Sequence, residues 1–297
     1  MVISRNEETT NLFLHRKMSP FGRHDRHVKR LSMNNRSSSF SPAQITGIIL
    51  LLVAAVLFFF NPLIAAAVAF FYIVVCVAAS FFPQSSFYLP VISRGHTGKN
   101  LVSLTFDDGP SEPTTKQILD LLDQYSAKAT FFVSGVNALK HPQIISEIIS
   151  RGHTVGNHSF HHNPFLMLGG YNYLYGEIFR TQEILQHMGI NPLIFRPPVG
   201  IISPKLPSVL NKLEMFCVTF SCRAGDFGNR RVNHLSSSIL EKVKADDIIL
   251  LHDASPRSGE AQTVLLGEIE KILQGLNHHG FKVVPLADLI GRHVSST

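Results

Sequence analysis

The chain has 297 residues, which leaves room for one domain of about 200 residues and additional segments. Its formal net charge is +6, and residues 1–42 contribute +5 of it, with eight Lys or Arg against three acidic residues. The rest of the chain is close to neutral, which argues against a nucleic-acid-binding domain. Three cysteines do not support a disulfide framework, and we expect Cys217 and Cys222 to be core thiols, although they could pair.

The N-terminal tail, residues 1–42, shows no apolar periodicity and is rich in Arg, His, Asn and Ser. A segment of this composition cannot bury enough apolar surface to fold by itself. We therefore expect a basic, disordered tail.

The next segment is apolar on all sides and has no Asp, Glu, Lys or Arg from residue 37 to residue 93, which predicts a membrane region over 43–82. It is too long for the apolar part of a cleavable signal peptide. Residues 43–60 and 63–82 are each about the length that crosses a bilayer, and Asn61-Pro62 between them is a turn signal. Two helices forming a transmembrane hairpin are preferred over one kinked span.

The orientation follows from the basic tail, because Lys and Arg remain on the cytoplasmic side. A hairpin would return the following domain to the cytoplasmic face, and a single span would carry it across. The sequence therefore predicts an integral protein of a bacterial inner (plasma) membrane and leaves the side of the domain open. Aromatic residues Phe81, Phe82, Phe87 and Tyr88 favour contact with membrane lipid or, alternatively, packing against the base of the domain. Residues 83–100 would then be a linker.

Beyond the linker, short apolar runs alternate with longer amphipathic ones in a domain expected over 101–292. This alternation predicts a parallel sheet, and seven strands favour a barrel over an open sheet. The expected strands are 101–106, 129–133, 154–156, 193–195, 216–220, 248–251 and 282–284. The expected helices are 114–125, 142–151, 173–187, 204–213, 236–244 and 263–276.

The first candidate site is Asp107-Asp108, which follows a buried strand and precedes a Gly-Pro turn. The carboxyl ends of barrel strands are where the loops that carry chemistry converge. Two adjacent carboxylates repel each other, so a site that keeps both ionised usually supplies a cation to one of them. The pair therefore predicts a metal.

The second candidate is His158 and His162, which stand four residues apart. One helical turn would put both imidazoles on one face, a spacing suited to a single ion. Two imidazoles and a carboxylate with open positions for water are typical of a catalytic zinc site. A chance pair is expected among fifteen histidines, so the inference depends on the Asp-Asp turn, and His161 is the expected bystander.

Three further residues carry weaker signals. Arg196 stands before two prolines and could donate hydrogen bonds to a carboxylate, or could be a surface arginine on a rigid loop. His252 ends a buried strand and could donate a proton at neutral pH, although a histidine at a strand end is common. Asp226 could orient a histidine or could simply cap a turn.

Four motifs in this order resemble the polysaccharide deacetylase family with the NodB homology domain. They are T-F-D-D-G-P at 105–110, H-S-F-H-H at 158–162, R-P-P-V-G at 196–200 and L-L-H-D at 250–253. The resemblance covers residues 101–289. It implies a distorted (β/α)7 barrel and the hydrolysis of N- or O-acetyl groups on sugars such as chitin, peptidoglycan and xylan, with a divalent metal.

Carried over by motif, the resemblance implies a role for each site residue. The metal, zinc or alternatively cobalt, nickel or manganese, would be bound by Asp108, His158 and His162. The other implied roles are general base for Asp107, orientation of that base for Arg196, general acid for His252, orientation of His252 for Asp226, an oxyanion N–H donor for Val199, and a wall of the acyl-methyl pocket for Leu250.

Two departures from the family pattern affect the substrate cleft. Val199 stands where an aromatic residue is common, and Phe227 stands where a Trp is common. Neither change removes a group that handles protons or metal. The expected substrate is therefore an acetylated glycan, with two alternatives: a deformylase or deacetylase of a lipid-linked sugar at the cytoplasmic face, or an inactive glycan-binding relative.

Overall fold

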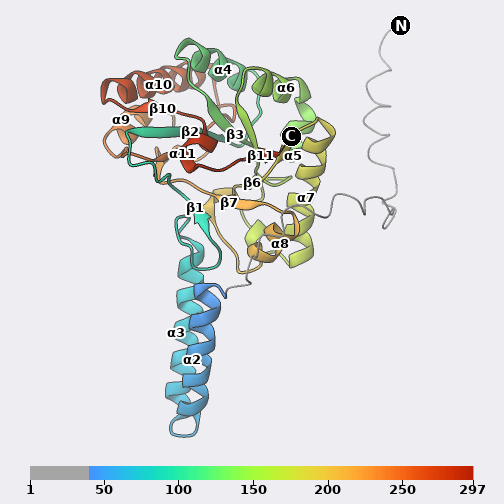
Figure 1. Cartoon of the computed structure of the whole chain (residues 1–297), viewed down its shortest axis with the longest axis vertical. Helices are drawn as coiled ribbons and strands as arrows, with labels where there is room; N and C mark the ends of the chain where they lie inside the picture. The colour runs from blue at the N-terminus through green and yellow to red at the C-terminus, as the bar shows by residue number, and fades with distance from the viewer. Residues whose placement is uncertain (1–39, 297) are drawn as a thin grey trace. The chain divides into compact units, whose positions relative to one another are not determined.

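A computed structural model of the chain describes residues 40–296 (Figure 1). Nearly all of the expected disordered tail lies outside the described residues. The part from Phe40 onward forms one compact unit, which contains both the apolar helices and the α/β domain.

Two apolar helices, α2 (Pro42–Phe58) and α3 (Pro62–Ser80), lie side by side (Figure 1). The turn between them is formed by Asn61, whose side chain accepts hydrogen bonds from the first N–H groups of α3. Among the described residues, α3 alone has the length and composition of a membrane span, with 19 residues and a mean hydropathy of 2.6. Helix α2 is equally apolar but shorter, with 17 residues.

The stretch 83–100, expected to be a linker, is packed into the domain. Tyr88 and Leu89 are buried, and strand β1 (Val91–Ile92) pairs in parallel with strand β7 (Phe216–Val218). The exposure of the expected aromatic belt is uneven: Phe81 and Phe82 are exposed, whereas Tyr88 is buried.

A parallel sheet forms the centre of the domain, in the order β1-β7-β6-β4-β3-β2-β9-β8. Apart from β1 and β8, its strands overlap the expected ones, and β5 (Asn191–Pro192) and β11 (Ser295–Ser296) form a separate antiparallel pair. The strands of the sheet are β2 (Leu101–Asp107), β3 (Ala129–Val133), β4 (Thr154–Asn157), β6 (Ile194–Phe195), β7 (Phe216–Val218), β8 (Cys222–Arg223) and β9 (Ile248–His252), with β10 (Lys282–Val283) paired to β2.

The expected α/β fold is confirmed as a half-barrel of parallel strands. The strand expected over 216–220 is present as β7 but ends at Val218, and β8, which follows it, was not predicted. Strands β7 and β8 come from one segment, which pairs with β6 at one edge of the sheet and with β9 at the other. Between them the backbone N–H of Thr219 donates to Ile92 and that of Ser221 donates to Ile248. The chain therefore leaves one ladder and joins the other, which curls the sheet.

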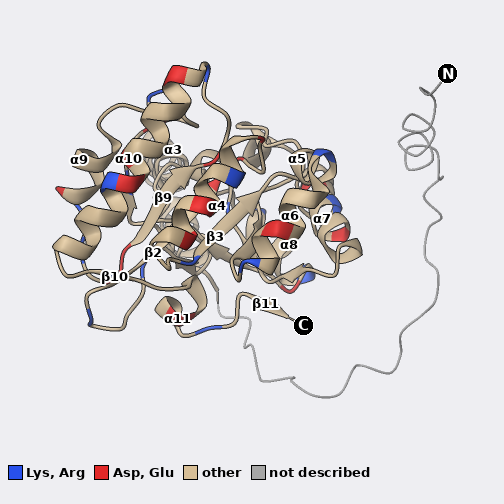
Figure 2. Ribbon diagram, turned by 90° about the horizontal axis from the view of Figure 1, so that it is seen from above, with Lys and Arg blue, Asp and Glu red and all other residues tan. Residues whose placement is uncertain are grey.

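Helices cover this sheet, and Figure 2 shows Lys, Arg, Asp and Glu distributed over them, for example on α4, α6 and α10. All six expected helices are present, although α9 ends four residues early. Helices α5 and α11 were not predicted, because five or six residues are too few to show a helical period. The helices are α4 (Thr114–Gln124), α5 (Gly135–Lys140), α6 (Pro142–Ser150), α7 (Tyr171–His187), α8 (Leu206–Lys212), α9 (Leu235–Leu240), α10 (Gly259–His278) and α11 (Leu286–Ile290), with short 3-10 turns at Leu166–Leu168 and Pro198–Gly200.

The hydrophobic core lies between the sheet and these helices, and side chains of β2 and α4 such as Leu104 and Ile118 are fully buried in it. Cys217 and Cys222 are free buried thiols, as expected. The core holds the strand ends rigidly, and these ends carry the candidate site.

Candidate active site

The predicted site residues gather at the carboxyl ends of the parallel strands. Asp107 and His252 end strands β2 and β9 and are register partners. His158 follows β4, and Arg196 follows β6. Because parallel strands end at the same edge of a sheet, four distant motifs meet there.

Asp107 is held by Arg196. The two side chains are 5% and 1% exposed, and Nη1 of Arg196 donates to Oδ1 of Asp107 at 2.7 Å. The same nitrogen donates to the hydroxyl of Thr105 at 2.8 Å, and the guanidinium lies 3.9 Å from the centre of the Phe132 ring. Burial lowers the pKa of Arg196, and the charge of Asp107 opposes this shift. The arrangement fixes one carboxylate oxygen and leaves Oδ2 facing His158, whose Nε2 is 3.7 Å away.

Asp108, His158 and His162 form a cluster that fits a metal ion. Their ligand atoms all lie within 4.8 Å of one another. Oδ1 of Asp108 is 3.0 Å from Nε2 of His162 and 3.6 Å from Nε2 of His158. Nevertheless this oxygen is buried without an aligned hydrogen-bond donor among the described residues. A buried acceptor facing two imidazole nitrogens, without a hydrogen bond, is what a cation would satisfy.

The charge state of Asp108 suits this purpose. Burial alone would raise its pKa, but the nearby His158 and His162 outweigh burial and hold the pKa well below its ordinary value. Its backbone is left-handed, with φ 78°, and Nδ2 of Asn137 donates to its carbonyl oxygen at 2.8 Å. The carboxylate is therefore ionised and locally fixed, as a metal ligand must be.

The expected helical turn over the two histidines is wrong, although their meeting is confirmed. The segment after β4 is a loop, because Ser159 and His162 have left-handed φ angles of 67° and 53°, which no helix accommodates. Nδ1 of His158 lies 2.8 Å from the carbonyl oxygen of Arg196, so this hydrogen bond leaves Nε2 facing the carboxylates.

His161 points away from the cluster, as expected of a bystander. Its backbone N–H and its Nδ1 contact the two carboxylate oxygens of buried Glu177 on α7, at 2.9 and 2.7 Å. Glu177 therefore clamps the loop between the two histidines. The sequence offers no signal for it beyond its place on an amphipathic helix.

His252 and Asp226 form the second proton-handling pair. Nδ1 of His252 lies 2.7 Å from Oδ2 of Asp226, and Nε2 lies 4.0 Å from Oδ2 of Asp108. Burial alone would lower the pKa of His252, but the hydrogen bond to Asp226 and the charges of Asp226 and Asp108 raise it to about 9. The imidazole can therefore carry a proton at neutral pH, with Nε2 facing the cluster.

The two residues implied in substrate binding lie at the same edge. Val199 has a left-handed φ of 51° and is 54% exposed in the loop after β6, whereas Leu250 is buried in β9. Phe227, in the position where the family commonly has Trp, is 65% exposed.

Asp253 is a site residue that sequence reasoning missed, although its motif was noted. Its Oδ1 accepts from the Gly109 N–H at 2.9 Å and its Oδ2 accepts from the Thr115 hydroxyl at 2.7 Å. Its backbone N–H donates to the carbonyl oxygen of Asp107. Asp253 thus holds the turn that carries both site carboxylates.

The chain is similar in sequence and fold to known proteins. The family model described as polysaccharide deacetylase matches residues 94–218. A peptidoglycan-N-acetylglucosamine deacetylase of Bacillus cereus is 30% identical over 194 residues, which are 65% of this chain and 89% of that protein. The chain belongs to the polysaccharide deacetylase family. The resemblance drawn from the four motifs is confirmed.

Further relatives share the domain. A chitooligosaccharide deacetylase of Azorhizobium caulinodans is 33% identical to this polysaccharide deacetylase over 196 residues, with 62% of this chain and 92% of the relative covered. A solved peptidoglycan N-acetylglucosamine deacetylase superposes with a TM-score of 0.63 and 30% identity, covering 69% of this chain and 95% of that one. A family 4 carbohydrate esterase from Streptomyces lividans, in complex with acetate, gives a TM-score of 0.57 and 30% identity, with 66% and 98% covered. As a member of this family, the protein is a hydrolase.

Proposed function

We propose that this polysaccharide deacetylase is a membrane-anchored, metal-dependent enzyme that removes N-acetyl (or O-acetyl) groups from a sugar or polysaccharide. One observation carries the proposal: Asp108, His158 and His162 converge within 4.8 Å beside a buried Asp107–Arg196 pair and a His252–Asp226 pair. The names of the relatives, which are deacetylases of peptidoglycan and of chito-oligosaccharides, support the substrate class.

The metal would be held by Asp108, His158 and His162. One carboxylate and two imidazoles favour a zinc-type ion, with cobalt, nickel and manganese as alternatives. A divalent ion there would polarise the acyl carbonyl and lower the pKa of a water molecule. The remaining steps belong to side chains of the protein.

Asp107 is the proposed general base, because its Oδ2 faces the cluster while Arg196 fixes Oδ1. It takes the proton of the attacking water. The backbone N–H of Val199 donates to the tetrahedral oxyanion, and Leu250 lines the pocket for the acyl methyl group. His252, held by Asp226, then donates its proton to the departing amine.

The two-helix hairpin is the proposed anchor in a bacterial inner (plasma) membrane, with lipid around α2 and α3. Apolar side chains on both helices are exposed; Leu51 is 72% and Leu63 is 80% exposed. Burial of such a surface in lipid is favourable, and water would not solvate it. We place the catalytic domain at 101–292, with 83–100 as the connection to the anchor.

A second candidate is a deformylase or deacetylase of a lipid-linked sugar at the cytoplasmic face. It is favoured by one observation: the N–H of Ala43, at the start of α2, donates to the carbonyl oxygen of Phe87, beyond the end of α3, at 3.0 Å. The start of α2 and the segment that follows α3 therefore lie next to each other, at the same end of the hairpin. Two spans would leave the domain on the side of the basic tail.

The test is release of acyl groups by the full chain in detergent, with and without metal. Acetylated chito-oligosaccharides and a lipid-linked formylated or acetylated amino sugar serve as substrates, and the Asp108→Ala variant serves as the control. Metal-dependent acetate from the oligosaccharide supports the first candidate, and release from the lipid-linked sugar alone supports the second. No release from either substrate would contradict both and favour an inactive glycan-binding protein. A reporter fused after Thr297 and read for compartment decides the side of the domain.

A further inference from the structure

Thr219 lies between the segment that leaves the apolar hairpin and the arginine that holds the base. It sits in the break between β7 and β8 and is fully buried. Its hydroxyl donates to the carbonyl oxygen of Pro83 at 2.7 Å, and its own carbonyl oxygen accepts from Nη2 of Arg196 at 2.8 Å. Its backbone N–H donates to Ile92 at 2.9 Å. Its polar groups therefore join residues 83–92 to Arg196.

The loop that carries Arg196 meets the same segment at two further points. The N–H of Ile202 donates at 3.0 Å to the carbonyl oxygen of Ser80, the last residue of α3. Gly200 packs so closely on the segment that an added Cβ would lie 3.2 Å from Cβ of Pro83.

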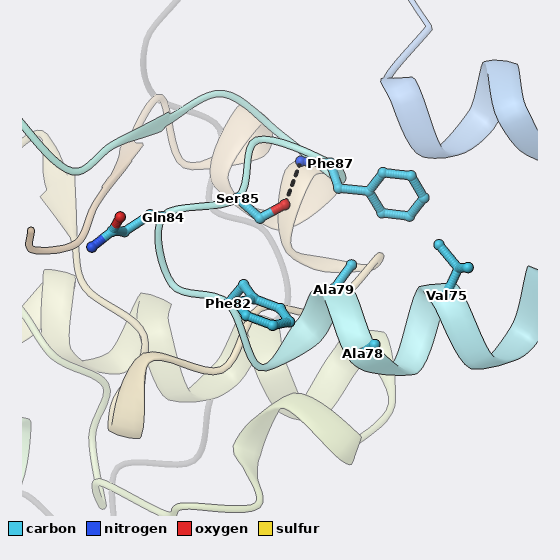
Figure 3. Close-up of a pocket in the computed structure, with 7 residues that line it drawn as sticks. All are labelled: Val75, Ala78, Ala79, Phe82, Gln84, Ser85 and Phe87. Carbon is cyan, nitrogen blue, oxygen red and sulfur yellow. Dashed lines mark hydrogen bonds between the residues drawn. The ribbon is translucent and has the colours of Figure 1, made fainter.

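Figure 3 shows how this segment leaves α3 through Phe82, Gln84 and Ser85 and turns back at Phe87, whose N–H donates to Oγ of Ser85. The bond between Ile202 and Ser80 puts the end of α3 in direct contact with the loop that follows Arg196.

The position of Arg196 depends on acceptors that do not move. A buried guanidinium requires partners for its N–H groups, and losing one leaves a costly unsatisfied donor. Thr219 lies outside strands β7 and β8, and its backbone is held there by the bond from its N–H to Ile92 and by the contacts of its side chain. The hydroxyl bond to Pro83 is one of these contacts.

We propose that Thr219 is a positioning residue that couples the end of the membrane anchor to Arg196, and through Arg196 to Asp107. The inference rests on the roles given to Asp107 and Arg196 under the proposed function. It extends the active site to the segment that connects the proposed anchor to the domain.

The test uses the full chain in detergent, saturated with zinc, and an acetylated chito-oligosaccharide. Thr219→Val keeps the shape of the side chain and removes the donor to Pro83. We expect kcat to fall about five- to tenfold, the effect of one buried hydrogen bond, with KM and bound zinc unchanged. Thr219→Ser restores the hydroxyl and should bring kcat back to within about twofold of the wild type.

The matched control is Thr130→Val. Thr130 is buried in strand β3, and its hydroxyl has no hydrogen-bond partner among the described residues. Its replacement should leave kcat unchanged, which shows that Thr-to-Val exchange in the sheet is harmless by itself.

A second variant tests whether Thr219 acts through its bond to Pro83. Pro83→Gly loosens the segment that accepts the bond, so Thr219→Val should have little further effect in that background. Fully additive effects, or a wild-type kcat in Thr219→Val, overturn the coupling while the deacetylase activity stands. A wild-type chain that releases no acyl group from any sugar overturns the proposed function and this inference together.

Discussion

Arg196 and Asp107 form a buried ion pair in which the arginine holds one carboxylate oxygen at 2.7 Å. Asp107→Asn keeps an oxygen for Arg196 but removes the proton acceptor. We expect kcat to fall by about 10²- to 10⁴-fold with bound metal nearly unchanged. Steady-state kinetics and metal analysis on the same preparation check this. Full activity would exclude Asp107 as the base.

The metal ligands should respond differently. Asp108→Ala or His162→Ala removes one of the three proposed protein ligands, so metal affinity should fall by more than the roughly 10- to 100-fold typical of outer contacts, together with the rate. Metal titration of the stripped protein measures both. His279→Ala, an exposed histidine at the end of α10, is the matched control. Unchanged metal content in the ligand variants would contradict the assignment.

Glu177 should affect metal affinity although it is not a proposed metal ligand. Its carboxylate holds His161 between the two histidines, so Glu177→Ala frees a loop that contains two left-handed residues. We expect metal affinity to fall about tenfold, as for other outer contacts of metal ligands. Glu183→Ala, an exposed residue of the same helix, provides the comparison. Equal affinities in the two variants would rule out the clamp.

The free energy of unfolding should depend on pH through one buried histidine. His153 is 4% exposed, and its Nδ1 accepts from the Ala129 N–H at 3.1 Å. Burial, aided by the charge of Lys128, lowers its pKa from 6.5 to about 4. Between pH 6.5 and 4, His153 is therefore protonated in the unfolded chain but remains neutral in the folded chain. The free energy of unfolding falls as the pH falls through this range.

Urea unfolding of the full chain in detergent at several pH values measures this loss, which should be of order 2 kcal/mol. His153→Asn keeps an acceptor for Ala129 and should lose this part of the pH dependence. Replacing exposed His279 by Asn should not. Parallel pH profiles for the wild type and His153→Asn would contradict the expectation.

The sequence predicted most of the framework and several of the residues that meet at the strand ends, because these depend on strong local signals. The Gly-Pro turn after a buried strand is an example, and Asp107-Asp108 lie at the strand end that it indicates. The short strands β1 and β8 were not predicted, because two residues are too few to show an alternation of apolar and polar side chains.

Long-range partners could not be read from the sequence. Asp253 is 144 residues from Gly109, and Thr219 is 136 residues from Pro83, so only the fold brings them together. For the histidine pair, the contact was predicted correctly but the local structure was not. A spacing of four residues fits a helical turn, but a loop with left-handed residues at Ser159 and His162 also brings the two rings together.

The pairing of Val91 with Cys217 leaves little slack in the polypeptide between the apolar hairpin and the barrel. A flexible tether would let an enzyme search a volume that grows with its length, and this connection is folded. With the proposed anchoring, the active site stays close to the membrane and cannot reach distant parts of a cell wall. Its substrates would then have to reach the active site close to the lipid surface.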